Sequence, residues 1–260
     1  MTRSGLYVYC VIGTGETRNF GPIGVGHRSD TVTTIAYRDL SAVISSVPMD
    51  RYEVGQKSML AHESVIEKVM MEHTVLPVRF CTVSPNAEEI RNLLRRRYTE
   101  FKKLLRELDN KVELGVKALW KDMNHLLRES MREGTRQEGL AVVPKANVNR
   151  TRAETEKRVR LVLEEERIKT RELLLEPLRP LADDLCFNKT YGDDMVMNVA
   201  FLVDRSRERE FDVRVEQLSD QYDTIEFKYV GPAPPYSFVN MVIKEQISPS
   251  PNQDDLRRRR

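Results

Sequence analysis

The stretch from Val230 to Val239 limits the possible folds most, because its composition forces the backbone out of regular structure. It reads Val-Gly-Pro-Ala-Pro-Pro-Tyr-Ser-Phe-Val. The strand pattern before it has one apolar face, formed by Ile225, Phe227 and Tyr229. Proline fixes φ and removes an amide donor, so we expect a stiff segment that leaves the sheet. Its aromatic side chains, Tyr236 and Phe238, need a surface to cover them, and we predict that the segment packs against the protein itself.

A second informative segment runs from Val75 to Val83 and reads Val-Leu-Pro-Val-Arg-Phe-Cys-Thr-Val. We predict one strand, entered through a proline. Alternation then places Phe80 on an apolar face and Arg79 on the opposite face, which is also mostly apolar. We therefore expect Arg79 to be partly buried and paired with a carboxylate or a carbonyl. Contact of Arg79 with a partner protein is the alternative.

These two segments, in this order, resemble the gas vesicle protein F/L family. Further segments that resemble the family are Leu6–Ile12, Asp39–Ser45, His62, Glu113–Trp120 and Asn198–Val203. The sequence departs from the family pattern in three places. The family usually has glycine where Cys81 stands and a bulkier residue than Ala233, and residues 139–152 lack the expected signature.

The resemblance implies a non-enzymatic accessory or minor structural protein of gas vesicle assembly. Such a protein binds the small hydrophobic shell subunit, gas vesicle protein A, together with other accessory proteins, and aids vesicle nucleation. The implied location is the gas vesicle, in the cytoplasm. The candidates for structural or partner contacts are Arg79, Phe80, Tyr236 and Phe238.

Composition is that of a soluble globular protein with room for two cores. The 260 residues are 40% hydrophobic and 32% charged. We find no apolar run near the ~20 residues needed to span a bilayer and no signal-peptide pattern. Three widely spaced cysteines predict reduced, buried thiols in the cytoplasm. The net charge of +2 argues against bulk binding of nucleic acid.

The pattern of elements predicts an α+β protein with two domains. Residues 1–110 should form an α/β sandwich of mixed strands. Its expected elements are a β-hairpin (31–37 and 40–47), an amphipathic helix (56–73) and a single long helix (85–108) that is capped by Ser84.

Residues 111–239 should form a modified ferredoxin-like domain with one strand lost or moved. Its expected elements are strands 112–120, 195–203 and 224–230, helices 122–132 and 208–222, and a long charged helix at about 150–176. Pro177 should end the long helix. Residues 240–260 should be a flexible basic tail, because they end in four arginines.

The residues give little support to catalysis, and we predict no catalytic, cofactor-binding or metal site. His62 and His73 stand eleven residues apart, about 16 Å along a helix, too far to share an ion. Cys81 is expected to be a small core residue. Two alternatives stay open: a nucleic-acid-binding protein that uses the basic tail and an aromatic platform at Phe227 and Tyr229, and a small-ligand enzyme. The oligomeric state stays open as well.

Overall fold

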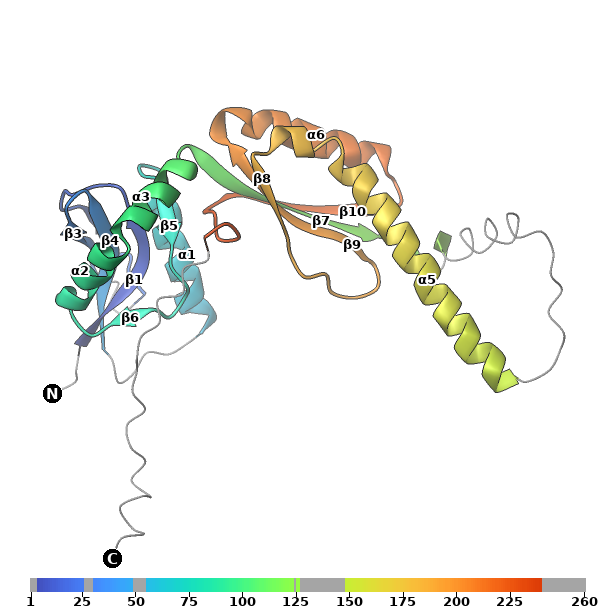
Figure 1. Ribbon diagram of the computed structural model, residues 1–260, viewed down its shortest axis with the longest axis horizontal. Helices are drawn as coiled ribbons and strands as arrows, with labels where there is room; N and C mark the ends of the chain where they lie inside the picture. The colour runs from blue at the N-terminus through green and yellow to red at the C-terminus, as the bar shows by residue number, and fades with distance from the viewer. Residues whose placement is uncertain (1–3, 26–29, 49–54, 124, 127–147, 240–260) are drawn as a thin grey trace, which may run out of the picture. The chain divides into compact units, whose positions relative to one another are not determined.

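The computed structural model describes residues 4–25, 30–48, 55–123, 125–126 and 148–239, with side chains in the last range from residue 157 onward. The described chain forms two compact units. The first extends to Asp109 and includes Val239, and the second runs from Asn110 to Phe238. Each unit has its own antiparallel sheet and its own helices (Figure 1). The predicted α+β class is therefore confirmed.

The sheet of the first unit is built around its first strand. The strand order is β2-β3-β4-β1-β5, and the short strand β6 also pairs with β1. The strands are β1 (Ser4–Ile12), β2 (Asn19–Gly21), β3 (Val32–Tyr37), β4 (Leu40–Pro48), β5 (Val75–Pro77) and β6 (Val83–Ser84). Every pairing is antiparallel. The predicted hairpin corresponds to β3 and β4, which are joined by the two-residue turn Arg38–Asp39.

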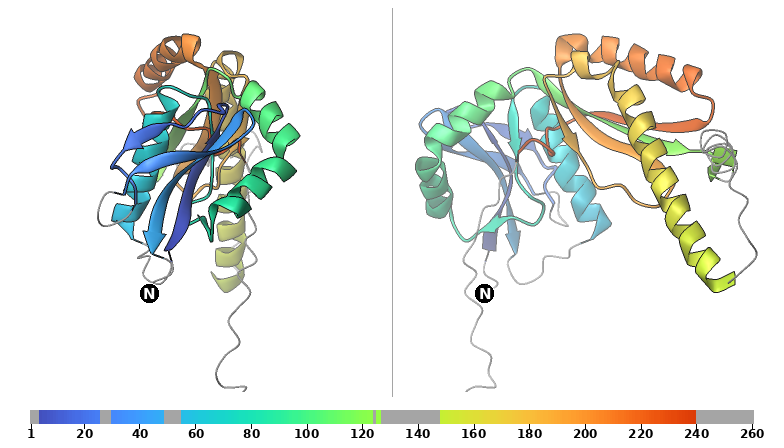
Figure 2. Two further views of the ribbon diagram at one scale, coloured as in Figure 1. Left: turned by 90° about the vertical axis from the view of Figure 1, so that its left-hand side faces the viewer. Right: turned by 45° about the vertical axis from the view of Figure 1, so that its right-hand side comes forward.

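Helices cover both faces of this sheet (Figure 2). One face packs against α1 (Gln56–Met70), whose residues Val65, Ile66 and Val69 join the core formed with β1 and β4. The other face carries α2 (Ala87–Arg96) and α3 (Tyr98–Glu107), which bury Leu94 and Phe101. The alternation of β1 therefore supplies apolar side chains to two cores, one on each side of the sheet.

The prediction of a single helix over 85–108 is wrong, because the helix is interrupted at Arg97. Arg97 has φ −107° and ψ 19°, outside the helical range, and separates α2 from α3. The predicted cap is wrong as well. Asn86 caps α2 by accepting the amide of Glu89 at 3.0 Å, whereas Ser84 belongs to β6 and pairs with Leu6.

The sheet of the second unit has four strands in the order β10-β7-β9-β8. They are β7 (Lys111–Trp120), β8 (Asp184–Phe187), β9 (Met195–Asp204) and β10 (Ile225–Ala233). Two helices, α5 (Val148–Leu175) and α6 (Glu208–Gln221), supply Leu174 and Phe211 to the core on one face of the sheet. Short 3₁₀ turns at Arg179–Leu181 and Arg205–Arg207 precede β8 and α6.

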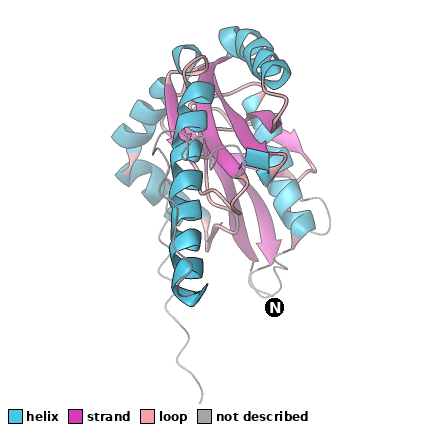
Figure 3. Ribbon diagram, turned by 90° about the vertical axis from the view of Figure 1, so that its right-hand side faces the viewer, coloured by secondary structure: helices cyan, strands magenta, loops and turns pink. Residues whose placement is uncertain are grey.

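Two expectations for the long helix are confirmed. Figure 3 shows α5 as one continuous helix, and it ends at Leu175, two residues before Pro177. Proline disfavours the helical conformation of the residue before it and cannot donate an amide hydrogen bond. Most of the helix predicted over 122–132 and the whole of the tail predicted over 240–260 lie outside the described residues.

Two expectations for the strands of this unit are wrong. We expected no strand between the long helix and residue 195, but Asp184–Phe187 forms β8, a four-residue strand too short to stand out in the sequence. The chain also does not leave the sheet at Gly231, since β10 resumes its pairing with β7 at Ala233, opposite Glu113. Gly231 makes this possible. It has φ 144°, and a Cβ there would lie 2.8 Å from Leu114 Cδ2.

Candidate functional site

The segment predicted as one strand over 75–83 is divided, because β5 ends at Pro77 and β6 begins at Val83. The intervening backbone is still bound to β1: the amide of Val78 donates to the carbonyl of Tyr9, at 2.9 Å. Cys81 has φ 66°, in the left-handed region, and it interrupts the strand between β5 and β6, which both run antiparallel to β1. The strict alternation expected across these residues is therefore lost.

Beneath this loop lies a buried network of tyrosine and histidine side chains. The hydroxyl of Tyr7 lies 3.0 Å from Nδ1 of His62 and accepts the amide of Cys81 at 3.0 Å. The hydroxyl of Tyr9 lies 2.8 Å from Oγ of Ser45. Both tyrosines are completely buried, and each hydroxyl has a partner that offsets the cost of burial. The network joins β1, α1, β4 and the 78–82 loop.

Burial controls the charge of His62. It lowers the pKa of the imidazole from 6.5 to about 4, opposed by a hydrogen bond with the backbone of Val78. His62 is therefore neutral near pH 7 and its ring packs against aromatic neighbours. The ring of Tyr9 is stacked at 5.7 Å between centroids, and the ring of Phe80 meets His62 edge-on at 5.6 Å. This arrangement suits a structural core histidine better than a proton carrier.

The two candidates on this loop have different surroundings. Phe80 is half-buried and packs on the network through His62. Arg79 is exposed, so the expected partial burial is wrong. The break in the strand explains the difference, because Arg79 no longer alternates with strand residues. In the part of the chain that the structure describes, no carboxylate forms an ion pair with the guanidinium of Arg79, so the expected pairing with a carboxylate is not found there.

The C-terminal segment is anchored by a carboxylate that the sequence analysis missed. Glu113 accepts the amide and the hydroxyl of Ser237, both at 2.7 Å. Pro234 and Pro235 are buried beside this anchor. Burial raises the pKa of Glu113, while the two hydrogen bonds from Ser237 act in the opposite direction. The segment is thus held within the second unit by prolines and hydrogen bonds.

The aromatic candidates of this segment contribute less than we expected. Phe238 is half-buried, but Tyr236 keeps 38% of its surface exposed. The expectation that both rings are covered is therefore wrong for Tyr236. Ser237, which lies between them in the chain, is the residue that Glu113 holds.

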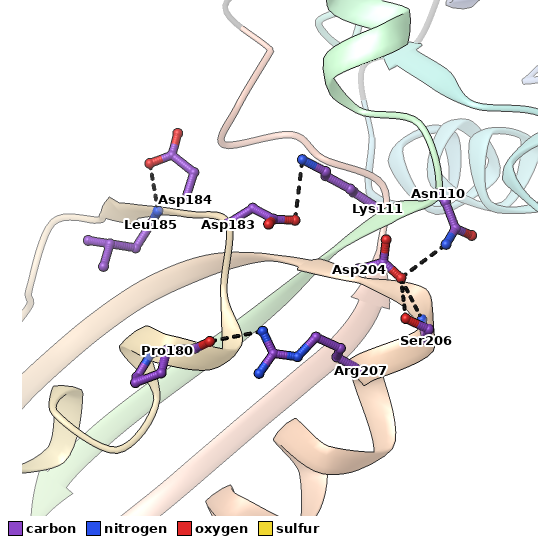
Figure 4. A network of polar contacts seen from close by, with 9 residues as sticks. All are labelled: Asn110, Lys111, Pro180, Asp183, Asp184, Leu185, Asp204, Ser206 and Arg207. Carbon is purple, nitrogen blue, oxygen red and sulfur yellow. Dashed lines mark hydrogen bonds and ion pairs between the residues drawn. The ribbon is translucent and has the colours of Figure 1, made fainter.

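A polar network ties together the strand ends near the start of β7 (Figure 4). Asp204 accepts hydrogen bonds from the side chains of Asn110 and Ser206, at 3.0 and 2.6 Å. The pKa of Asp204 is lowered, first by the hydroxyl of Ser206. Lys111 pairs with Asp183 at 3.2 Å, and Arg207 donates to the carbonyl of Pro180 at 2.9 Å. These contacts fix β7, β8, β9 and the start of α6 relative to one another.

A cavity of about 290 Å³ lies between the end of α5 and α6. Its lining is mixed, with apolar Leu173, Pro177 and Tyr222 beside polar Arg214 and Gln217. Within the described residues, no group of three or more His, Cys, Asp or Glu side chains is placed to hold a metal ion. None of the described helices has both the length and the apolar character required to cross a membrane.

The aromatic platform considered for nucleic acid is partly covered by the protein itself. Phe227 and Tyr229 are partly buried against the apolar core of the second unit, and Tyr229 is stacked on Phe211 at 6.2 Å. The hydroxyl of Tyr229 donates to Asp212. The ring of Tyr229 already packs against α6 and that of Phe227 against the core, so this feature does not favour RNA recognition.

Comparison with known proteins identifies the family. The model of the gas vesicle synthesis protein GvpL/GvpF family matches residues 5–240. The chain belongs to this family. It is 24% identical over 218 residues to gas vesicle protein F1 of Halobacterium salinarum, covering 83% of this chain and 84% of that protein. It is 27% identical over 219 residues to gas vesicle protein F of a Streptomyces species, covering 83% of this chain and 91% of that protein.

The fold agrees with that of solved members. The crystal structure of GvpF from Anabaena has a TM-score of 0.76 and 23% identity, covering 92% of this chain and 99% of that chain. The crystal structure of GvpF from Microcystis aeruginosa has a TM-score of 0.74 and 23% identity, covering 91% of this chain and 99% of that chain. The family expected from the two proline-containing segments is thus confirmed, and the protein is related to gas vesicles.

Proposed function

We propose that this protein is an accessory and minor structural component of gas vesicle assembly. In this role it binds the small hydrophobic shell subunit, gas vesicle protein A, works with other accessory proteins and aids nucleation of the vesicle. The observation that carries the proposal is the family match, which spans residues 5–240 of a family described as gas vesicle synthesis proteins. The proposed location is the gas vesicle, in the cytoplasm, and the proposed role is not catalytic.

We place the contact with the shell subunit on the second unit. Most exposed large hydrophobic side chains among the described residues belong to it, whereas the first unit contributes Met59, Leu60 and Met71. On α5, Leu161 and Ile168 are 57% and 44% exposed. They stand seven residues apart, so they lie on the same side of the helix, two turns from each other. A hydrophobic client gains most from apolar surface of this kind.

The same unit supports the finer description of its fold as ferredoxin-like. Its elements follow the order β7, α5, β8, β9, α6, β10, which is the βαββαβ sequence of that fold. All three strand pairings are antiparallel, and the first and third strands lie at the centre of the sheet. The two helices supply the core on one face, as a two-layer sandwich requires.

Co-expression with gas vesicle protein A tests the proposal. The double change Leu161→Ser and Ile168→Ser removes two exposed apolar side chains, so it should leave the fold intact and reduce recovery of the shell subunit at least fivefold. The matched control is Met59→Ser with Leu60→Ser, on α1 of the first unit. Recovery with that control should match the unchanged protein.

Two results would count against the proposal in different ways. If the unchanged protein recovers no shell subunit from detergent-free lysate, and vesicles form normally in a deletion strain, the assembly role is wrong. If both double variants lose the shell subunit equally, the assembly role stands but α5 is not the contact. Circular dichroism of each variant confirms that a loss of recovery does not come from unfolding.

A further inference from the structure

An exposed arginine at the tip of the β3–β4 hairpin contacts two tyrosine rings. The guanidinium carbon of Arg38 lies 5.5 Å from the ring centre of Tyr37 and 5.3 Å from that of Tyr98. The two rings meet edge-on at 6.2 Å. Tyr37 comes from β3 and Tyr98 from the first turn of α3, so the arrangement joins residues 60 positions apart in the chain. Such contacts of arginine with aromatic rings stabilise one position of a long side chain.

The surroundings fix this arrangement from several directions. Arg38 has φ 55°, in the left-handed region that a two-residue hairpin turn uses. The loop before β2 lies against it, since a Cβ on Gly15 would be 2.1 Å from the carbonyl oxygen of Arg38. Tyr98 is held by its hydroxyl, which donates to Asp39. Lys102 binds the other oxygen of Asp39 at 2.7 Å.

The neighbouring carboxylate is committed to these partners. Hydrogen bonds from Lys102 and then from Tyr98 lower the pKa of Asp39 to about 2, so the carboxylate is ionised at neutral pH and its charge is offset by Lys102. The structure therefore orders Arg38 without giving it an acidic partner. Among the described residues, no carboxylate pairs with its guanidinium.

Arg97, in the same unit, is an arginine that has both an aromatic contact and a carboxylate partner. Its guanidinium carbon lies 4.9 Å from the ring centre of Phe101. Its N–H groups also form two parallel hydrogen bonds to Glu100, from Nε at 2.7 Å and from Nη2 at 2.6 Å. Arg97 thus combines a ring contact with a bidentate carboxylate. Arg38 has two ring contacts and, among the described residues, no carboxylate partner.

We propose that Tyr37, Arg38 and Tyr98 form a docking point for a carboxylate side chain of a partner protein. The occupant is an Asp or Glu in an acidic segment, bound by the N–H groups of Arg38 while the rings hold the guanidinium in place. Because the side chain is already ordered, binding costs less conformational entropy than at a free surface arginine. Arginine and tyrosine are also the residue types enriched among strong interface contacts.

This docking point goes beyond the proposed function, because it recognises a different chemistry on a different unit. The surface proposed for the shell subunit is apolar and lies on α5. The surface around Arg38 lies on the first unit and selects negative charge. The two interactions are therefore separable by mutation.

The test uses the full chain and two peptides of eight residues, both acetylated and amidated: one alternates Glu and Ala, and its match has Gln in place of Glu. Binding is measured at low ionic strength by titration calorimetry and by the NMR signal of arginine Nε–H. We expect the Glu peptide to bind and to shift the Arg38 signal, and the Gln peptide to bind at least fivefold more weakly.

Two variants of Arg38 and one control locate the binding. Arg38→Asn keeps a residue that tolerates positive φ and should preserve the turn. Arg38→Lys keeps the charge but loses the planar group that forms two parallel bonds. Both variants should lower the affinity for the Glu peptide about fivefold or more. Arg96→Gln removes an exposed charge of α2 and should change affinity less than twofold.

Several outcomes would overturn the proposal. No binding of the Glu peptide by the unchanged protein does so directly. If melting curves show that both variants are folded, equal losses of affinity for the Glu peptide in Arg38→Lys and Arg96→Gln would mean that the peptide is bound by general charge attraction. Tighter binding of a single-stranded DNA oligonucleotide, lost in the same Arg38 variants, would make the occupant a phosphate and not a protein carboxylate.

Discussion

The two units differ in what they bury. The buried polar side chains of the described residues, Ser41, Ser45, His62 and Ser84, all lie in the first unit. There the hydroxyls of Tyr7 and Tyr9 also form hydrogen bonds within the core. The central cluster of the second unit contains apolar side chains, with Phe201 and Phe211 5.0 Å apart at its centre.

This difference predicts different sensitivities. A buried hydrogen-bond network loses stability when one partner changes its protonation state or is removed. An apolar core responds mainly to changes in volume. The stability of the first unit should therefore depend on pH, chiefly through His62, and the stability of the second unit should depend on how well its aromatic side chains fill the core.

The largest expected effect comes from Phe211→Ala in the second unit. Phe211 is completely buried between Phe201 and Tyr229, so its truncation leaves a cavity and should cost about 3–5 kcal/mol. The chain has one tryptophan, Trp120, which lies in this core and reports on its unfolding in urea. Phe187→Ala, at a position that is 53% exposed, is the matched control and should cost less than about 1 kcal/mol. Equal shifts of the two midpoints would mean that Phe211 does not support the core.

A second prediction concerns acid and the first unit. The pKa of His62 is about 4 in the folded protein against an ordinary value of 6.5, so the unfolded chain binds this proton more readily. The stabilisation is complete above about pH 6.5 and is lost as the pH falls toward 4, by ~3 kcal/mol. Urea unfolding followed by tyrosine circular dichroism at pH 7 and at pH 4.5 measures the loss.

The control for this prediction is His62→Gln, which cannot titrate in that range. The variant should be less stable than the unchanged protein at pH 7, and most of the pH dependence should disappear. An unchanged slope between pH 7 and 4.5 in His62→Gln would assign the effect to other groups, including His73, whose pKa burial also lowers. The signal of Trp120 serves as the reference for the second unit.

Local sequence signals predicted much of the fold. The β3–β4 hairpin and the long helix α5 follow from alternation, helical periodicity and Pro177, all of which act over short distances. The interruption at Arg97 could not be predicted from such signals, because the apolar periodicity of α2 continues into α3. Strand β8 was missed because four residues with one charge give too weak a pattern.

The sites were harder to predict, because they depend on residues distant in the chain. The contact between Tyr7 and His62 joins positions 55 apart, and the anchor between Glu113 and Ser237 joins positions 124 apart. Alternation in β1 does place Tyr7 and Tyr9 on one face, which was the available signal. Nothing in either segment alone specifies which partner will meet it. The predicted burial of Arg79 was wrong for a related reason, since alternation of apolar residues does not reveal the turn at Cys81.

The smallest predicted effect tests that turn. Cys81 has φ 66°, which costs a residue with a Cβ roughly 1–2 kcal/mol, and glycine avoids this cost. Glycine also gains freedom in the unfolded chain, which opposes the benefit by about 0.5–1 kcal/mol. Cys81→Gly should therefore stabilise the first unit by about 0.5 kcal/mol and keep the amide bond to Tyr7. Cys81→Ala removes the same thiol but keeps the Cβ, so its midpoint in urea should not rise. If Ala stabilised as much as Gly, the thiol would be the source of the strain, and the backbone would have to be discarded as its cause.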